Sequence, residues 1–102
     1  MSHLLTRDET ERAIEFMRAS GFTGALRVLV RPEQYGVVGD RWCMVEHVSP
    51  GGASVYPIKV SLRPHVPHGG QAQFKLGEVI AARVTVEALE HPDWPADLRG
   101  ER

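Results

Sequence analysis

The apolar residues follow a helical period only near the start of the chain. Three of them share one side of a helix whose opposite side is charged, namely Ala13, Ile14 and Met17. Thr6 followed by Glu9 fits a capping box, and Gly21 is suited to a left-handed C-cap. The pattern therefore predicts one amphipathic helix over residues 6–20, which needs an apolar surface to cover.

After Gly24 the apolar period changes from 3.6 to 2, the spacing of half-buried strands. Strand-like runs occupy residues 26–31, 34–38, 41–48, 56–62, 72–76 and 80–88. Gly39-Asp40 predicts a hairpin between the second and third runs, and Gly77-Glu78 predicts another between the last two. Residues 63–70 contain two prolines and two glycines, which predicts an irregular loop.

This element order predicts an α+β fold, in which the N-terminal helix packs on about five antiparallel strands. Two arrangements fit equally, an open twisted sheet or a small, partly closed β-barrel. The length of 102 residues suits one domain. We assign residues 1–89 to this domain and residues 90–102 to an acidic, proline-containing C-terminal tail with Trp94 as its large anchor.

The run Phe74-Lys-Leu-Gly-Glu-Val-Ile-Ala81, continued to Leu89, resembles the final hairpin of the C-terminal β-barrel of translation elongation factors. The resemblance spans 16 residues and implies a β-hairpin there. It assigns no family and carries over no functional residue.

Composition and segment lengths restrict the class of protein. The chain is 42% apolar and 25% charged, close to the globular average. No apolar run reaches the ~18 residues of a membrane span. The N-terminal segment is too short and too acidic for a signal peptide. We expect a cytoplasmic protein that does not bind membranes. Cys43 is the only cysteine, which excludes an internal disulfide, and we expect it to be a small core residue.

Histidines supply the candidate metal ligands. His65 and His68 lie three residues apart in the predicted loop, and His47 is a third imidazole. Zinc needs three or four protein ligands, and nothing in the sequence forces His47, Glu46 or Cys43 to approach the loop. We therefore expect solvated or proline-packed imidazoles, no metal and no cofactor.

The strand over residues 41–48 leaves an ambiguity with consequences for catalysis. Strict alternation sends either Glu46 or His47 toward the core, where a buried ionisable group would be a site candidate. Alternatively, both residues reach water near the strand end. Cys43 and His47 stand roughly 14 Å apart along a strand, too far for a nucleophile and base pair. Phosphate-loop and hydrolase motifs are missing, so we expect no enzyme. A small-molecule enzyme using Glu46 and His47, or the loop histidines, is the second alternative.

The charges are segregated although the net charge is only −1. Residues 21–89 carry seven cations against five acids, and both ends of the chain are acidic. If the apolar alternates face the helix, the outward strand positions carry six cations and one acid: Arg27, Leu29, Arg31, Lys59, Ser61, Arg63, Gln71, Gln73, Lys75, Arg83, Thr85 and Glu87. Ordinary solvent-facing and edge-protecting roles explain such cations equally well.

The functional interpretation of this basic sheet face is that it docks an anionic partner. We expect a small binding or regulatory module that contacts an acidic protein surface, or a second copy of itself, with help from His65 and His68 in the loop. A nucleic-acid-binding small β-barrel is the alternative. It is disfavoured because single-strand binders place aromatic residues among their cations, and the outward positions above hold none.

Overall fold

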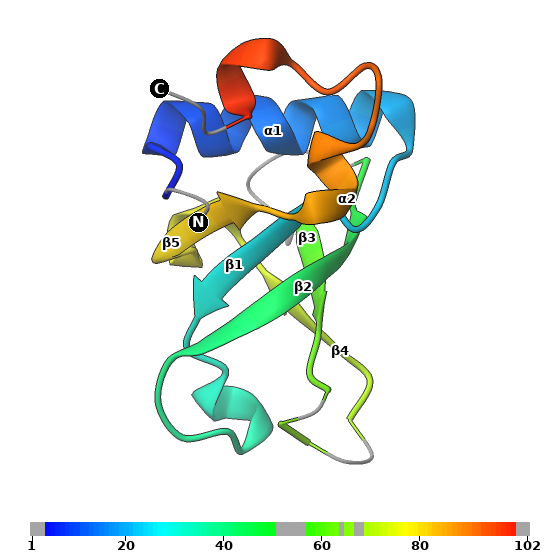
Figure 1. The fold of residues 1–102 in the computed structure, drawn as a ribbon. Coiled ribbons are helices and arrows are strands. Elements are labelled where there is room, and N and C mark those ends of the chain that lie inside the picture. The colour runs from blue at the N-terminus through cyan, green and yellow to red at the C-terminus, as the bar shows by residue number, and fades with distance from the viewer. Residues whose placement is uncertain (1–3, 51–56, 64, 67–68, 100–102) are drawn as a thin grey trace.

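The computed structural model describes residues 4–50, 57–63, 65–66 and 69–99 and contains one long helix over an antiparallel sheet (Figure 1). The helices are α1 (Arg7–Ser20) and the single turn α2 (Val86–Leu89). The strands are β1 (Leu26–Val30), β2 (Arg41–Val48), β3 (Ile58–Ser61), β4 (Gln71–Phe74) and β5 (Ala81–Val84). Short 3-10 turns occupy η1 (Glu33–Tyr35), η2 (Leu76–Glu78) and η3 (Ala96–Leu98).

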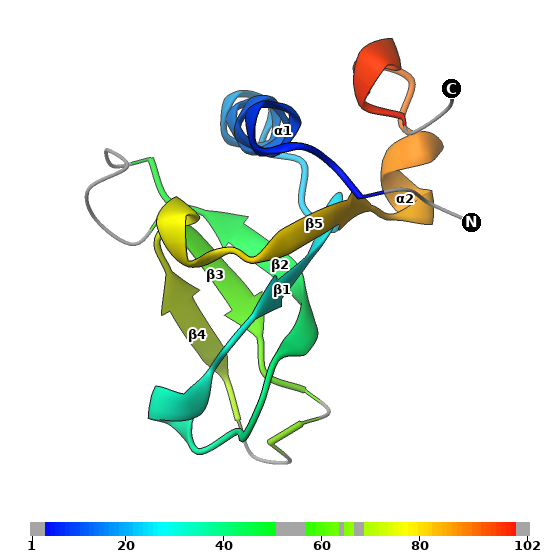
Figure 2. The same ribbon diagram turned by 90° about the vertical axis from the view of Figure 1, so that its left-hand side faces the viewer.

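The five strands form one sheet in the order β4-β3-β2-β1-β5, and every neighbouring pair is antiparallel. Strands β4 and β5 lie at opposite edges and do not pair within the described part of the chain. The sheet is therefore open and twisted (Figure 2), and the predicted α+β class is confirmed in its open-sheet form.

Helix α1 confirms the predicted helix and both of its caps. The Thr6 hydroxyl accepts from the Glu9 N–H at 3.1 Å, and the Glu9 carboxylate accepts from the Thr6 N–H at 2.9 Å. Gly21 ends the helix with φ 76°, a conformation that favours glycine. The apolar stripe of α1 packs in one core with inward strand residues, and this core includes Ile14, Met17, Leu26, Val28, Ile58, Val60 and Val84.

Both sheet edges carry additional contacts. At the β5 edge, the Leu5 N–H donates to the Ala82 carbonyl at 2.8 Å, and Leu4 pairs with Arg83. At the β4 edge, the Gln73 N–H donates to the Tyr35 hydroxyl of η1 at 3.2 Å. Because unpaired edges invite association with other strands, these contacts limit edge-to-edge pairing.

The first predicted hairpin is correct only in part. Strand β2 does pair with a preceding strand, but the partner is β1 rather than residues 34–38. Residues 33–35 form the turn η1, which begins after Pro32 and ends at Gly36 with φ 86°. Pro32 and Val37 are buried, so this connection packs against the protein while its backbone stays out of the ladder.

The second predicted hairpin, which the elongation-factor resemblance also implied, is wrong. Strands β4 and β5 lie at opposite edges and are joined through η2. The run over residues 80–88 is divided by Thr85, whose hydroxyl accepts from the Ala88 N–H and caps α2. Ile80 and Val86, predicted to face inward, are 53% and 65% exposed because neither lies in β5. In the run over residues 56–62, Tyr56 lies outside the described residues.

Residues 90–99 pack beside α1 (Figure 1). Trp94 and Leu98 are buried. The Trp94 ring packs edge to face on the ring of Phe16 in α1, with 5.2 Å between the ring centroids. The Arg99 guanidinium donates to the carbonyls of Leu89, His91 and Trp94. This arginine holds the segment together by occupying carbonyls that no regular ladder uses.

Candidate binding face

A bulge in β2 decides which of its side chains reach the surface. Val45 pairs with Val60, yet His47 pairs with Lys59, so one extra residue lies between them. Val45 and Val48 are consequently both buried, whereas Glu46 and His47 are both exposed. Of the alternatives considered for these two residues, the structure supports the one in which both reach water.

The buried residues of β2 also determine which way Trp42 and Met44 point, and neither was among the predicted outward positions. Cys43 and Val45 point into the core, so the residues between and before them point outward. The signal was present in the sequence, because Cys43, Val45 and Val48 are spaced by two and then by three. An interval of three within a period of two indicates a bulge.

Two rows of paired residues cross β5, β1 and β2 on this outward side. One row joins Arg83, Arg27 and Met44, and the other joins Ala81, Leu29 and Trp42. Leu4 extends the first row because it pairs with Arg83, and it is 55% exposed. We call this surface the outer face; it consists of Leu4, Arg27, Leu29, Trp42, Met44, Ala81 and Arg83.

A stacked pair on the outer face joins β5 to β2. The Arg83 guanidinium carbon lies 4.2 Å from the centroid of the Trp42 ring, a cation–π contact. Both residues are half-buried, and Arg27 beside them is exposed. No carboxylate of the described residues forms an ion pair with Arg27 or Arg83. The outer face thus combines an apolar centre with two cations that the chain does not neutralise.

The other predicted basic residues are dispersed. Arg31 forms an ion pair with Asp40 at 2.8 Å, and this hydrogen-bonded carboxylate raises the pKa of the guanidinium. Lys75 lies before η2, away from β1 and β2 in the strand order. Thr85, predicted to face outward, is buried because its hydroxyl donates to the Gly24 carbonyl. Glu87 lies in α2.

Lys59 and Arg63 lie on the β3 side of the sheet. Arg63 borders a polar hollow of about 250 Å³ that is also lined by Glu46, Ser61, Gly69, Gly70 and Gln71. There the Gln71 amide donates to the Glu46 carboxylate at 3.0 Å. His65 Nε2 lies 3.4 Å from the Trp42 carbonyl oxygen, which brings the loop beside the outer face. His68 lies outside the described residues.

Cys43 is buried, as the sequence predicted, with 1% of its surface exposed. Burial raises the pKa of its thiol, and the positive charges of Arg27 and Arg41 partly oppose that rise. Among the residues that the structure describes, no three histidine, cysteine or carboxylate side chains gather as metal ligands. Because His68 is outside that set, the expectation of no bound metal stays a prediction.

Comparison of the chain with protein-family models, curated proteins and solved structures found no match. None of the described helices is long and apolar enough to cross a membrane.

Proposed function

We propose that this protein is a small binding module that docks an acidic surface of another protein on its outer face. The observation that carries the proposal is the Arg83–Trp42 stack with Arg27 beside it, two cations without an ion-pair partner in the described chain. Arg31 differs from these two arginines because its charge is already neutralised by Asp40.

The composition of the outer face fits a protein partner. Tryptophan, methionine and arginine are enriched at protein interfaces, and tryptophan and arginine dominate their binding energy. Leu29, Trp42 and Met44 supply apolar contact area at the centre. The planar guanidinium of Arg83 stacks on the Trp42 ring and keeps its edge N–H groups for a carboxylate, which it can bind through two hydrogen bonds.

Nucleic-acid binding is the second candidate, and one observation favours it. Trp42 supplies the aromatic ring that the predicted outward positions lacked. Against it, Trp42 is the single aromatic ring of the outer face, and Arg83 already covers one side of that ring. The net charge of −1 also opposes attraction of a polyanion at long range. Leu4, Leu29 and Met44 offer aliphatic contacts in place of further stacking platforms.

Fluorescence anisotropy with three labelled probes separates the two candidates. The probes are a short peptide of alternating aspartate and leucine, the same peptide with lysine for aspartate, and an oligothymidine. We expect the acidic peptide to bind, the basic peptide not to bind, and Arg83→Glu to weaken the acidic peptide at least about tenfold. We expect oligothymidine to bind more weakly than ~10 μM at physiological salt. Submicromolar oligothymidine binding that Arg83→Glu abolishes would make nucleic-acid binding the leading function.

A further inference from the structure

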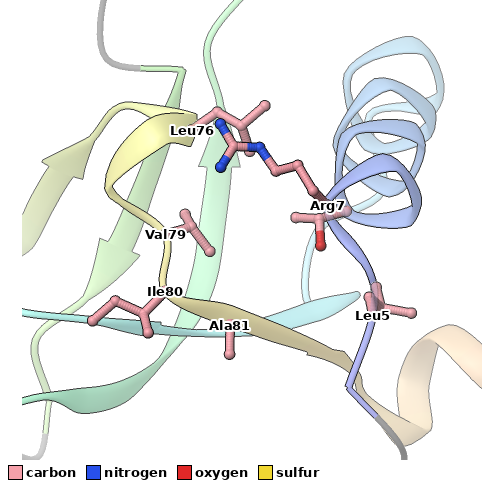
Figure 3. Close-up of a pocket in the computed structure, with 7 residues that line it drawn as sticks. Leu5, Arg7, Leu76, Val79, Ile80 and Ala81 are labelled. Atoms are coloured by element: carbon pink, nitrogen blue, oxygen red, sulfur yellow. The ribbon is translucent and has the colours of Figure 1, made fainter.

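A second concave site lies between the start of α1 and the segment that leads from η2 into β5 (Figure 3). Its volume is about 130 Å³, and its walls are mostly aliphatic: Leu5, Leu76, Val79, Ile80 and Ala81, with Arg7 and Thr10 from α1. Figure 3 shows the Arg7 side chain extending from the helix toward Leu76, over the pocket. Its rim stays apolar where Ile80 is 53% exposed.

The size of this pocket restricts what it can hold. Sites for metabolites and cofactors span roughly 300–1,000 Å³, so this pocket is too small for them. A dry cavity of about 150 Å³ accepts benzene, which is close in size to a leucine or isoleucine side chain. The pocket therefore suits a single aliphatic side chain.

The charge at the pocket is positive and comes from one residue. Arg7 has a single ion-pair partner in the described chain, Glu11 at 3.8 Å, and both side chains are more than half exposed. Exposed ion pairs of this kind contribute little to the free energy of folding, so a carboxylate with better geometry can compete with Glu11 for the guanidinium. Two polar groups near Arg7 already have hydrogen-bond partners at the helix start. The Glu9 carboxylate accepts from the Thr6 N–H, and the Thr10 hydroxyl donates to the Thr6 carbonyl.

We propose that this pocket binds the C-terminal residue of a partner chain. The aliphatic side chain of that residue enters the pocket and its α-carboxylate pairs with Arg7. A C-terminal residue fits because its side chain and its α-carboxylate lie only a few bonds apart. The pocket likewise offers space for one aliphatic side chain with one guanidinium, that of Arg7, beside it. The start of α1 adds a favourable field for the carboxylate. The pocket shares only Ala81 with the outer face, and neither Arg83 nor Trp42 lines it. This proposal therefore does not depend on the proposed function.

Amino-acid derivatives provide matched probes for NMR titration of the isotope-labelled protein at neutral pH. N-acetyl-leucine carries the side chain and the carboxylate, N-acetyl-leucinamide carries the side chain alone, and N-acetylglycine carries the carboxylate alone. We expect N-acetyl-leucine to shift the amide signals of Val79, Ile80 and Ala81 with a dissociation constant on the order of millimolar. We expect the amide to bind at least about fivefold more weakly and N-acetylglycine not to saturate.

Two exposed arginines give the matched variants. Arg7→Gln should remove the preference for N-acetyl-leucine over its amide, whereas Arg63→Gln, which loses the same charge elsewhere, should keep it. Equal binding of the acid and the amide to the wild type would identify a pocket for an internal side chain and overturn the proposal. Absence of saturable shifts, or shifts that map outside the pocket, would overturn it as well.

Discussion

Arg83 on β5 reaches across β1 and places its guanidinium carbon 4.2 Å from the centroid of the Trp42 ring on β2. The contact holds two long side chains in place before any partner arrives, which reduces the conformational entropy lost on binding. It also joins a cation to the apolar centre of the outer face, so a partner that matches both must present carboxylates next to apolar groups.

The first prediction compares two arginines of the same region that differ in pairing. Arg27 has no ion-pair partner in the described chain, whereas Arg31 is paired with Asp40. Arg27→Gln should slow association with the acidic peptide several-fold, because unneutralised charge steers encounter. Arg31→Gln is the matched control and should have a smaller effect. Stopped-flow association rates measure this, and equal effects of the two variants would argue against the outer face.

The second prediction tests the core. Ile14 is 3% exposed and packs in the core between α1 and the sheet, so Ile14→Ala should lower the free energy of unfolding by ~2 to 4 kcal/mol. Glu15→Ala, on the exposed side of the same helix, should change it by less than about 0.5 kcal/mol. Urea denaturation measures both. A loss below about 0.5 kcal/mol for Ile14→Ala would show that the helix does not belong to the core.

The third prediction follows from the buried thiol of Cys43. Burial raises its pKa in the folded state, so folding favours the protonated form. The resulting stabilisation is fully present below the unfolded pKa of about 8.5 and is lost as the pH rises through the folded pKa. The stability of the wild type relative to Cys43→Ala should therefore decrease when urea denaturation is repeated at increasingly alkaline pH. A difference that stays constant would contradict the raised pKa.

The fourth prediction concerns metal. His65 lies 3.4 Å from a backbone carbonyl oxygen, and the described residues offer no set of three ligands. The purified protein should contain no stoichiometric zinc, and a chelator should leave its melting temperature unchanged. Elemental analysis that finds one metal per chain, lost in a His65→Ala/His68→Ala double variant, would refute this.

Sequence reasoning predicted the features set by local chemistry. Thr6, Glu9 and Gly21 define α1 because capping depends on neighbouring residues alone. The alternation of β1 and β3 likewise gave their buried residues. Strand order was not predictable in this way, since Gly77-Glu78 matches a hairpin turn while tertiary packing sends β4 and β5 to opposite edges.

The candidate site was predicted only in part, because its cations follow from local alternation whereas its geometry depends on tertiary packing. Arg27 and Arg83 follow from strand alternation, but the cross-strand register that brings Arg83 to Trp42 is a tertiary property. One bulged residue in β2 changes the face of every side chain on one side of it. A strict period of two therefore left the face of Trp42 and Met44 undecided, because it sent either Glu46 or His47 toward the core.

Site-specific photo-crosslinking from the outer face tests the central claim most directly. A benzophenone amino acid replaces Met44 in cells that naturally make the protein, and the same residue replaces Val86, which is 65% exposed on α2, as the control. The account predicts a covalent adduct from position 44 whose mapped partner peptide is rich in aspartate and glutamate. That adduct should disappear with Arg27→Glu and Arg83→Glu and should not form from position 86. An adduct with RNA or DNA, or equal capture from both positions, would contradict it.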